Sequence, residues 1–411
     1  MSTGQKLTLL ERTPAALGMA RRKRSHGDVG AIVPWSTPIV QTAVYNFPNL
    51  GSLDDHYEGR APGSYVYGRD GLPNSDELAK KVAELEHADR GMACSSGMAS
   101  LFVAIASSVG KGDHIVASPD LYGGTLLLLG RELPRFGIKT TFSDSTDVST
   151  FENAMKREGA KIVLVETISN PTMKVCDLKE LARAAEEAGS LLIVDNTFAS
   201  PFVIRPLDLG ADVVMHSGTK SLGGHHDLTI GLLCGGSKVI ERAYQFNIVL
   251  GAIPGPFDSW LANRSLLTWK VRTEESCRNA MRLAKYLEGR EEVEHVFYPG
   301  LESHPQHALA KRIFSDGMYG WMLSFTLKGR LAEADSFVKA LKRVTLTPSL
   351  GGVGTTISHP GKTSHRRISE AQRKELGITE TMIRVSVGIE DYSLTEEDFD
   401  RALRASQRRK P

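Results

Sequence analysis

Short apolar runs alternate with amphipathic stretches through the middle of the chain. The runs are rich in β-branched residues, each is followed by polar residues, and they cover 114–117, 161–166, 191–195 and 213–215. The stretch from Leu178 to Ala188 carries apolar residues at helical spacing between two of these runs. Strands that are apolar on both faces and alternate with helices are typical of a parallel sheet covered by helices. We therefore predict an α/β fold in which ligands bind outside the carboxyl ends of the strands.

Changes in this pattern divide the chain into three parts. Residues 1–71 are rich in Gly, Pro and Tyr and poor in periodic structure, so we expect an N-terminal arm that lies over other surfaces. Residues 72–258 hold the alternation of strands and helices and form the predicted large, cofactor-binding domain. The pattern breaks at 253–256, and we place a smaller C-terminal domain at 259–411. A chain of 411 residues is long enough for two such domains.

Some elements can be placed within these parts. The first firm helix is expected to open at Asn74, with Glu77 three residues later as a capping-box partner. A long helix is expected from Ser259 to about residue 288, and strands are expected near 321–327 and 383–387.

Composition and charge describe a globular protein and argue against several partners. The net charge of +2 gives no overall field for nucleic acid or an anionic membrane. No apolar run approaches the roughly 20 residues that a bilayer span needs, so we expect a cytoplasmic protein that contacts no membrane. The basic run at 21–24 is short and lacks aromatic neighbours, and we interpret it as a solvated arm. The scattered cysteines are interpreted as reduced structural residues; they are Cys94, Cys176, Cys234 and Cys277.

A lysine in the turn His216-Ser217-Gly218-Thr219-Lys220, directly after an apolar run, is the most informative chemical feature. Lys220 can form a Schiff base with the aldehyde of pyridoxal phosphate, and the hydroxyls of Ser217 and Thr219 can hold its phosphate. Asp195, at the end of an earlier apolar run, can pair with the protonated pyridine nitrogen. This residue set predicts a pyridoxal-phosphate site.

Two further motifs offer groups for the phosphate. Ser96, Gly97 and Met98 precede an apolar helical run, so their amides are expected at a helix N-terminus, where phosphate binds well. The same motif also fits an ordinary helix cap. Tyr67 and Arg69 present a phenol and a guanidinium suited to phosphate, although an exposed loop would carry them equally well.

Three other features have both a functional and an ordinary interpretation. Tyr122 follows an expected strand and precedes two glycines, so it can stack on a cofactor ring or fill the core. Arg384 alternates with apolar residues, so it can clamp a carboxylate or face water. The cluster of His216, His225 and His226 with an adjacent aspartate suggests metal ligands, but its spacing matches no metal signature, and we expect no metal.

Together these motifs resemble those of the pyridoxal-phosphate enzymes of cysteine and methionine metabolism, the trans-sulfuration group of cystathionine lyases, cystathionine synthases and methionine lyases. The resemblance runs from about residue 34 to residue 404, and eight motifs follow one another in family order. They are YGRDGLPNSDELAKKVAELE, SSGMAS, LYGGT, ETISNPTMKVCDL, VDNTFASP, HSGTKSLGGHHDLTIGLL, SLGGVGTTISHPGKTSH and IRVSVGIEDYSLTEEDFDRAL. Each motif is weak alone, whereas eight in order are very specific.

The resemblance implies a fold of the aminotransferase-like type (fold type I), with a mostly parallel seven-stranded sheet and a smaller α+β C-terminal domain. It implies a homotetramer built of two dimers with shared active sites. In it Lys220 carries the cofactor, Asp195 pairs with the ring nitrogen and Tyr122 stacks on the ring. The implied phosphate contacts are Ser96, Gly97, Met98, Ser217 and Thr219, with Tyr67 and Arg69 from the neighbouring subunit. The implied contacts of the substrate carboxylate are Asn170, Ser349 and Arg384.

The implied reaction is a lyase reaction on a small amino acid, with Lys220 as base and Tyr122 or Tyr67 adjusting protons. We expect γ-elimination on a sulfur-containing amino acid such as cystathionine, methionine or homocysteine, giving a 2-oxo acid, ammonia and a thiol. The alternatives are β-elimination from cystathionine, γ-replacement as in cystathionine γ-synthases or O-acylhomoserine sulfhydrylases, and γ-elimination of a non-sulfur group, as from canavanine. A cofactor-binding protein without turnover is a further alternative, which the intact residue set disfavours.

Three positions depart from patterns of the family. Cystathionine-handling relatives often carry an acid after SLGG-x and another near the Tyr-x-Arg motif, where this chain has Gly354 and Val66. Both departures remove charges that could hold a distal ammonium group. Methionine lyases usually place a cysteine two positions after the stacking tyrosine, where this chain has Gly124, which argues against a typical methionine lyase.

Overall fold

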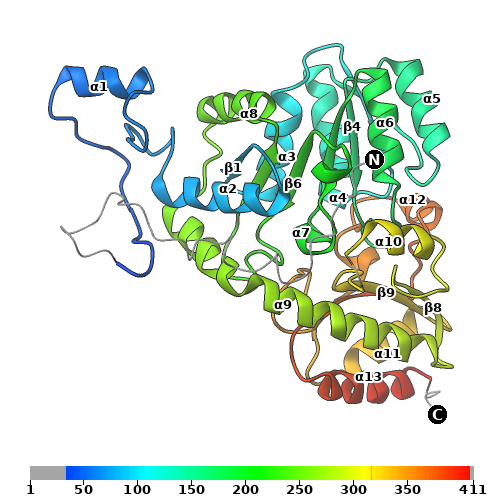
Figure 1. Ribbon diagram of the computed structural model, residues 1–411. Helices are drawn as coiled ribbons and strands as arrows, with labels where there is room; N and C mark the ends of the chain where they lie inside the picture. Colours follow the sequence, from blue (N-terminus) through cyan, green and yellow to red (C-terminus); the bar gives the residue numbers. More distant parts are fainter. Residues whose placement is uncertain (1–33, 316, 408–411) are drawn as a thin grey trace, which may run out of the picture.

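The computed structural model describes residues 34–315 and 317–407, and Figure 1 shows their arrangement. A large sheet with helices on both faces occupies one half of the molecule, and a smaller sheet with helices occupies the other. The basic run at 21–24 and the first part of the expected arm lie outside the described residues.

The large sheet has seven strands in the order β1-β7-β6-β5-β4-β2-β3. Its strands are β1 (Arg90–Cys94), β2 (His114–Ala117), β3 (Lys139–Phe142), β4 (Ile162–Glu166), β5 (Leu191–Asp195), β6 (Val213–Ser217) and β7 (Gly231–Gly235). Only β7 runs antiparallel to its neighbours, β1 and β6. The predicted mostly parallel seven-stranded sheet is therefore confirmed, and the four apolar runs form β2, β4, β5 and β6.

Two apolar clusters, one on each face, hold helices against this sheet. Val194 of β5 packs in the cluster that includes Leu78 and Leu181, while its neighbour Ile193 packs in the cluster that includes Leu101. This follows from the alternation of side chains along a strand. The helices of this half are α2 (Pro73–Glu86), α3 (Gly97–Ala106), α4 (Gly123–Leu127), α5 (Val148–Glu158), α6 (Leu178–Ala188), α7 (Ser200–Val203) and α8 (Ser237–Leu250).

Helix α6 shows how local sequence sets these boundaries. Asp177 precedes the helix and accepts a hydrogen bond from the amide of Glu180, which caps the N-terminus. Gly189 ends the helix in the left-handed conformation at φ 68°, which glycine adopts without steric cost. Apolar spacing together with these two caps explains why the predicted helix from Leu178 to Ala188 is confirmed at both ends.

The C-terminal half is built on a mixed five-stranded sheet in the order β10-β11-β12-β9-β8. Its strands are β8 (Val293–Phe297), β9 (Met322–Leu327), β10 (Thr345–Leu346), β11 (Thr356–Ser358) and β12 (Met382–Ser386). Its helices are α10 (His307–Ile313), α11 (Leu331–Ala340), α12 (Glu370–Glu375) and α13 (Tyr392–Ser406). The expected strands near 321–327 and 383–387 are β9 and β12.

One long helix, α9 (Pro256–Glu288), belongs to both halves (Figure 1). Near its start, Asn263 donates from Nδ2 to the carbonyl of Asn74 in α2. Four turns further on, Asn279 donates from Nδ2 to the carbonyl of Gly388, which follows β12. The boundary expected between 258 and 259 thus falls in the first turn of a helix that ties the two halves together. No helix in the described part of the chain, α9 included, is both long and apolar enough to cross a membrane.

The segment from 34 to 71 carries only one helix, α1 (Leu50–Tyr57), which has no buried residue and stands away from the body in Figure 1. The prediction that Asn74 opens helix α2 is wrong, because the helix begins at Pro73 without a side-chain cap. Asn74 instead fixes the extended segment, accepting from the amide of Val40 and donating to the carbonyl of Pro38. Its side chain is thereby committed to the arm and cannot cap the helix.

Candidate active site

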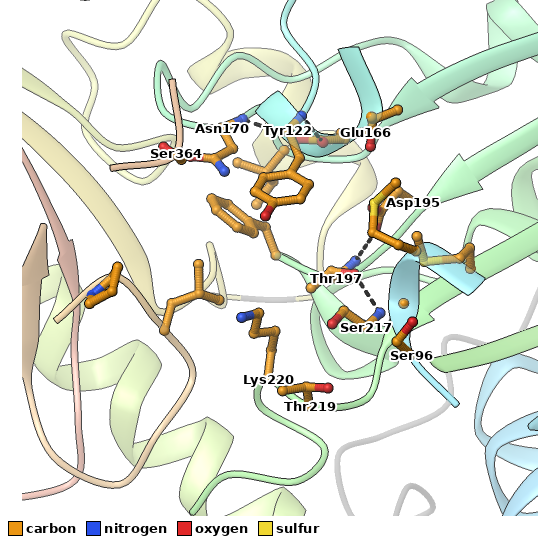
Figure 2. Close-up of a pocket in the computed structure, with 18 of the residues that line it drawn as sticks. Ser96, Tyr122, Glu166, Asn170, Asp195, Thr197, Ser217, Thr219, Lys220 and Ser364 are labelled. Carbon is orange, nitrogen blue, oxygen red and sulfur yellow. Dashed lines mark hydrogen bonds between the residues drawn. The ribbon is translucent and has the colours of Figure 1, made fainter. Parts of the chain in front are cut away.

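A cavity of about 410 Å³ opens where the carboxyl ends of β4, β5 and β6 meet the C-terminal half. Most of the residues that the sequence marked for chemistry line it; they are Ser96, Gly97, Met98, Tyr122, Asn170, Asp195, Ser217, Thr219, Lys220 and Arg384. Figure 2 shows the amine of Lys220 and the hydroxyl of Tyr122 pointing into the same space. The cavity thus lies outside the carboxyl ends of the strands, where the sequence predicted the ligand site.

Lys220 is held by a tight turn after β6. The backbone amide of Lys220 donates to the carbonyl of Ser217 at 3.0 Å. The hydroxyl of Thr219 donates to the carbonyl of Ile230, which directly precedes β7, and accepts from the amide of the same residue. Burial lowers the pKa of the Lys220 amine, and the nearby guanidinium of Arg384 lowers it further. A lowered pKa raises the fraction of neutral amine, which is the form that attacks an aldehyde or accepts a proton.

Two carboxyl groups stand side by side at the floor of the cavity, because Glu166 of β4 is in register with Asp195 of β5. Burial raises the pKa of Asp195 above its ordinary value, and hydrogen bonds from Thr197 offset only part of this rise. Thr197 donates from its amide to Oδ1 of Asp195 at 2.9 Å, and its hydroxyl accepts from the amide of Ser217. Burial and the neighbouring Asp195 raise the pKa of Glu166 well above its ordinary value. Of the two groups, Asp195 is therefore the better placed to carry a negative charge.

The N-terminus of α3 lies on the wall of the cavity, where Ser96, Gly97 and Met98 form a site suited to an anion, called here the cradle. Ser96 caps the helix by accepting from the amide of Ala99 at 3.1 Å. The amides of Gly97 and Met98 precede the first hydrogen bonds within the helix, and both residues line the cavity. A Cβ added at Gly97 would lie 2.7 Å from Cβ of Ser217, so only glycine lets the helix end approach the strand this closely. Such a helix end favours phosphate.

The C-terminal half contributes a cation to the cavity. Arg384 of β12 is buried, and its Nη1 donates to Oδ1 of Asn170 at 2.8 Å. The backbone amide of Asn170 in turn donates to the carboxyl group of Glu166, which also accepts from the backbone amide of Tyr122 at 2.6 Å. Glu166 thus links the loop that carries Tyr122 to the residue that orients Arg384.

Three predicted residues lie outside the cavity. Tyr67 is 43% exposed, and Arg69 donates to the carbonyl of Ile248 next to a separate surface cavity. The guanidinium of Arg69 also lies 5.5 Å from the centre of the Tyr67 ring. Ser349 does not line the cavity, although both of its chain neighbours do, and its hydroxyl lies 3.4 Å from Nδ1 of His226.

Sequence reasoning missed Glu166, Thr197 and Ser364, which line the cavity. Glu166 ends an apolar strand as Asp195 does, and the Asp-x-Thr spacing at Thr197 is typical of a local turn, so both had a recognisable signal. Ser364 had no such signal, because it reaches the cavity only through the packing of its loop against the start of α4. The two segments are so close that a Cβ on Gly123, the first residue of α4, would lie 2.0 Å from the Ser364 carbonyl oxygen.

The histidine cluster is dispersed. His216 is buried against Glu86, His225 approaches the carbonyl of Gly223, and His226 lies beside Ser349. Within 34–315 and 317–407, no group of three or more potential ligands could hold a metal ion. The four cysteines are buried and unpaired.

The chemistry of the lining fits pyridoxal phosphate: an amine with a lowered pKa faces the cavity, a buried carboxyl group stands at its floor, and the cradle at Gly97 suits an anion. The family model described as Cys/Met metabolism PLP-dependent enzyme matches residues 20–404. The chain belongs to this family. Pyridoxal phosphate is accordingly its cofactor, and the prediction of an enzyme of the carbon-sulfur lyase type is confirmed at the level of the family.

Similar proteins carry several activities. The chain is 40% identical over 369 residues to a cystathionine gamma-lyase of Bacillus subtilis (strain 168), which covers 90% of this chain and 94% of that relative. It is also 40% identical over 369 residues to a cystathionine beta-lyase of Lactococcus lactis subsp. cremoris (strain MG1363), covering 90% and 93%. A solved cystathionine gamma synthase from Xanthomonas oryzae pv. oryzae has a TM-score of 0.85 at 33% identity, covering 90% and 93%. The predicted fold is thereby confirmed.

The close approach of Gly97 to Ser217 can be tested by substitution. Gly97→Ala should push the start of α3 away from Ser217 and weaken the binding of pyridoxal phosphate at least about tenfold, or about 1.4 kcal/mol. Cofactor dissociation is measured by ultrafiltration of the holoenzyme. Gly110→Ala is the matched control, because a Cβ there meets no atom within 4 Å. Wild-type affinity in Gly97→Ala, with the control also unchanged, would show that the cradle does not hold the phosphate.

Proposed function

We propose that the protein removes the γ-substituent of an amino acid, most directly a sulfur-containing one, and releases a 2-oxo acid, ammonia and the thiol. The observation that carries this proposal is the joining of Lys220, Asp195 and Arg384 around one cavity by two halves of the molecule. An amine, a buried carboxylate and a carboxylate-binding cation are what pyridoxal-phosphate chemistry on an amino acid requires.

Lys220 is proposed to hold the cofactor and then to act as the base. Bound pyridoxal phosphate supplies an aldehyde for the amine and a ring that accepts electrons when a proton leaves the substrate. Lys220 suits both tasks because burial and Arg384 lower its pKa, which favours the neutral amine that takes the α-proton. Once the amine has given that proton up, it can take a β-proton. Asp195 keeps the ring nitrogen protonated, and the two bonds from Thr197 hold its carboxylate in place.

The proposed contacts of the cofactor follow the walls of the cavity. Tyr122 stacks on the ring, and its hydroxyl moves a proton to or from the amine or the leaving group. The proposed phosphate contacts are Ser96, Gly97, Met98, Ser217 and Thr219. Tyr67 and Arg69 are proposed to complete the phosphate site of a neighbouring subunit in a homotetramer, which accounts for their distance from the cavity of their own chain.

The substrate carboxylate is proposed to bind Arg384. Burial lowers the pKa of this guanidinium to about 10, which leaves it charged at neutral pH. Asn170 fixes its orientation through the bond at 2.8 Å, and Ser349 is the third proposed contact. A planar guanidinium whose one edge is held by the protein presents the other edge to a carboxylate.

The far end of the cavity is proposed to take an uncharged γ-substituent. By the resemblance, Val66 and Gly354 stand at positions where relatives often carry acids that could hold a distal ammonium, and burying such an ammonium without a partner is costly. Neither residue lines the cavity of its own chain. A cysteine-like side chain at 124 would require Tyr122 to move, because a Cβ there would lie 2.5 Å from its ring. The pocket therefore differs from the patterns of both cystathionine-handling enzymes and methionine lyases.

Release of 2-oxo acid from a panel of amino acids tests the proposed function and its alternatives. Methionine, homocysteine and O-acylated homoserine should match or exceed cystathionine in kcat/KM. Pyruvate from cystathionine would instead indicate β-elimination, a thioether product in the presence of added thiol would indicate γ-replacement, and turnover of canavanine would indicate a non-sulfur leaving group. The absence of any turnover by cofactor-loaded protein would contradict an enzymatic role.

Gly354→Glu should shift the preference towards cystathionine, because it supplies a charge for the distal ammonium. The position can accept the side chain, since an added Cβ meets no atom within 4 Å. Gly354→Gln, which has the same size without the charge, is the matched control. If the parent enzyme strongly prefers cystathionine and ignores the neutral substrates, this interpretation of Val66 and Gly354 is wrong.

Mixing two variants that are impaired in different ways tests the sharing of sites. Arg69→Ala should weaken cofactor affinity by roughly 1.5–3 kcal/mol, the range for a hydrogen bond to a charged group. A hybrid of an Arg69→Ala subunit with a Lys220→Ala subunit should regain activity, because one of its sites then contains only wild-type residues. No recovery in hybrids shown to form would indicate that each site lies within one subunit.

A further inference from the structure

A buried pair of a carboxyl group and an imidazole, which the proposed chemistry does not use, lies behind the cavity. Glu86 is the last residue of α2 and His216 is in β6, and their side chains are 0% and 1% exposed. Nε2 of His216 lies 2.6 Å from Oε1 of Glu86. This separation is shorter than the roughly 2.7–2.9 Å of an ordinary charge-assisted N–H···O bond, so the two side chains are in close contact. Removing charged groups from water is costly, so a pair in this position calls for an explanation beyond simple packing.

Asn196 extends the pair into a network. Its Nδ2 donates to Oε1 of Glu86 and to the carbonyl of Ile204, both at 3.0 Å. Its Oδ1 accepts from the hydroxyl of Thr167 at 2.9 Å. The second carboxylate oxygen of Glu86 is buried and has no hydrogen-bond partner in the described part of the chain. The network therefore joins the end of α2 to the ends of β4, β5 and β6.

The network stands directly behind the proposed cofactor contacts. His216 immediately precedes Ser217, and Asn196 immediately follows Asp195. Successive residues of a strand point to opposite faces, so His216 and Asn196 point towards α2 while Ser217 and Asp195 point into the cavity. The amide of Asn196 also donates to the carbonyl of Met215 at 2.9 Å, which locks the two strand ends together.

Other ionisable groups also lie near Glu86 and His216. Cys234 of β7 is close enough to Glu86 that the carboxylate, after burial, raises the pKa of its thiol. Arg205 donates from Nε to the carbonyl of Leu85 at the end of α2. His87 pairs with Asp208 at 3.0 Å nearer the surface.

Asp195 is the ionisable group of the cavity that this pair affects. Burial raises the pKa of the Asp195 carboxyl above its ordinary value, and the bonds from Thr197 and the charge that His216 carries when protonated oppose this rise.

We propose that Glu86, His216 and Asn196 form a positioning unit that aligns the ends of β5 and β6 and places a positive charge behind Asp195. The inference rests on the proposed roles of Asp195 and Ser217 as cofactor contacts. His216 thus serves the cofactor from the far side of the sheet, as a partner of the residues that touch it.

His216→Gln tests this unit, because the amide can still donate to Glu86 while the positive charge is lost. Ionised Asp195 binds the protonated ring, so affinity is present above the pKa of this carboxyl and is lost as pH falls through it. Loss of the His216 charge raises that pKa, and the acidic limb of cofactor affinity should move up by ~1 pH unit. The dissociation of pyridoxal phosphate from the full-length holoenzyme is measured by ultrafiltration across a pH series, together with the absorbance of the bound cofactor.

A control separates this role from general stability. Asp398 is fully buried in the C-terminal half, where it accepts from the amides of Lys342 and Val344, so Asp398→Asn should lower the melting temperature without moving the pH profile. A His216→Gln protein that loses thermal stability but keeps the wild-type pH profile would overturn the proposal. Asp195→Ala reports on the premise separately: if its cofactor affinity and absorbance are unchanged, the proposed role of Asp195 fails instead.

A milder variant covers the case in which His216→Gln does not fold. Thr167→Val leaves the contact between Glu86 and His216 intact and removes only the donor to Asn196. Because Asn196 then holds the strand ends less firmly, cofactor affinity at neutral pH should fall about threefold, whereas the acidic limb should stay in place because His216 is unchanged. Unchanged affinity in folded Thr167→Val, with His216→Gln unfolded, would also overturn the proposal.

Discussion

The alignment of β4, β5 and β6 is the constraint on which the rest of the site depends. The three strands are parallel, and Glu166 pairs with Asp195 while Asp195 pairs with Met215, two residues before Ser217. Glu166, Asp195 and Ser217 therefore reach the same edge of the sheet. Two carboxyl groups side by side under burial cannot both carry charge at little cost. The donors from Thr197 and the charge behind the sheet favour ionisation of Asp195, and burial keeps Glu166 closer to neutral. The order of charges in the cavity therefore follows from the register of the sheet.

The second half of the molecule completes the cavity through Arg384. A guanidinium buried on β12 needs a partner, and Asn170, on the loop after β4, provides it at 2.8 Å. Glu166 accepts from the backbone amides of Asn170 and Tyr122. The same carboxyl group therefore fixes both the loop that carries Tyr122 and the residue that orients Arg384. Helix α9 spans both halves and keeps this arrangement together. The geometry of the proposed substrate contacts thus depends on contacts that lie far apart in the sequence.

Features governed by local rules could be predicted from the sequence, and features that depend on long-range packing could not. Apolar runs set β5, and caps at Asp177 and Gly189 set α6, so both were placed correctly. The capping role expected for Asn74 was wrong because the arm at 38–40 competes for the same side chain. Thr197 and Glu166 had local signals that could have revealed them, whereas the buried pairing of Glu86 with His216 joins residues 130 positions apart and has no local signature. The family motifs supplied the proposed roles of Tyr67 and Arg69, which a single chain leaves outside the cavity.

The central claim is that the amine of Lys220, at the carboxyl edge of the sheet, holds pyridoxal phosphate. Borohydride reduction of the holoenzyme, followed by proteolysis and mass spectrometry of the peptides, tests it most directly, because reduction makes the link between lysine and cofactor permanent. The account predicts that the added mass lies on the peptide containing Lys220. Added mass on a peptide containing another lysine, such as Lys174 beside Asp120, with Lys220 unmodified, would contradict it.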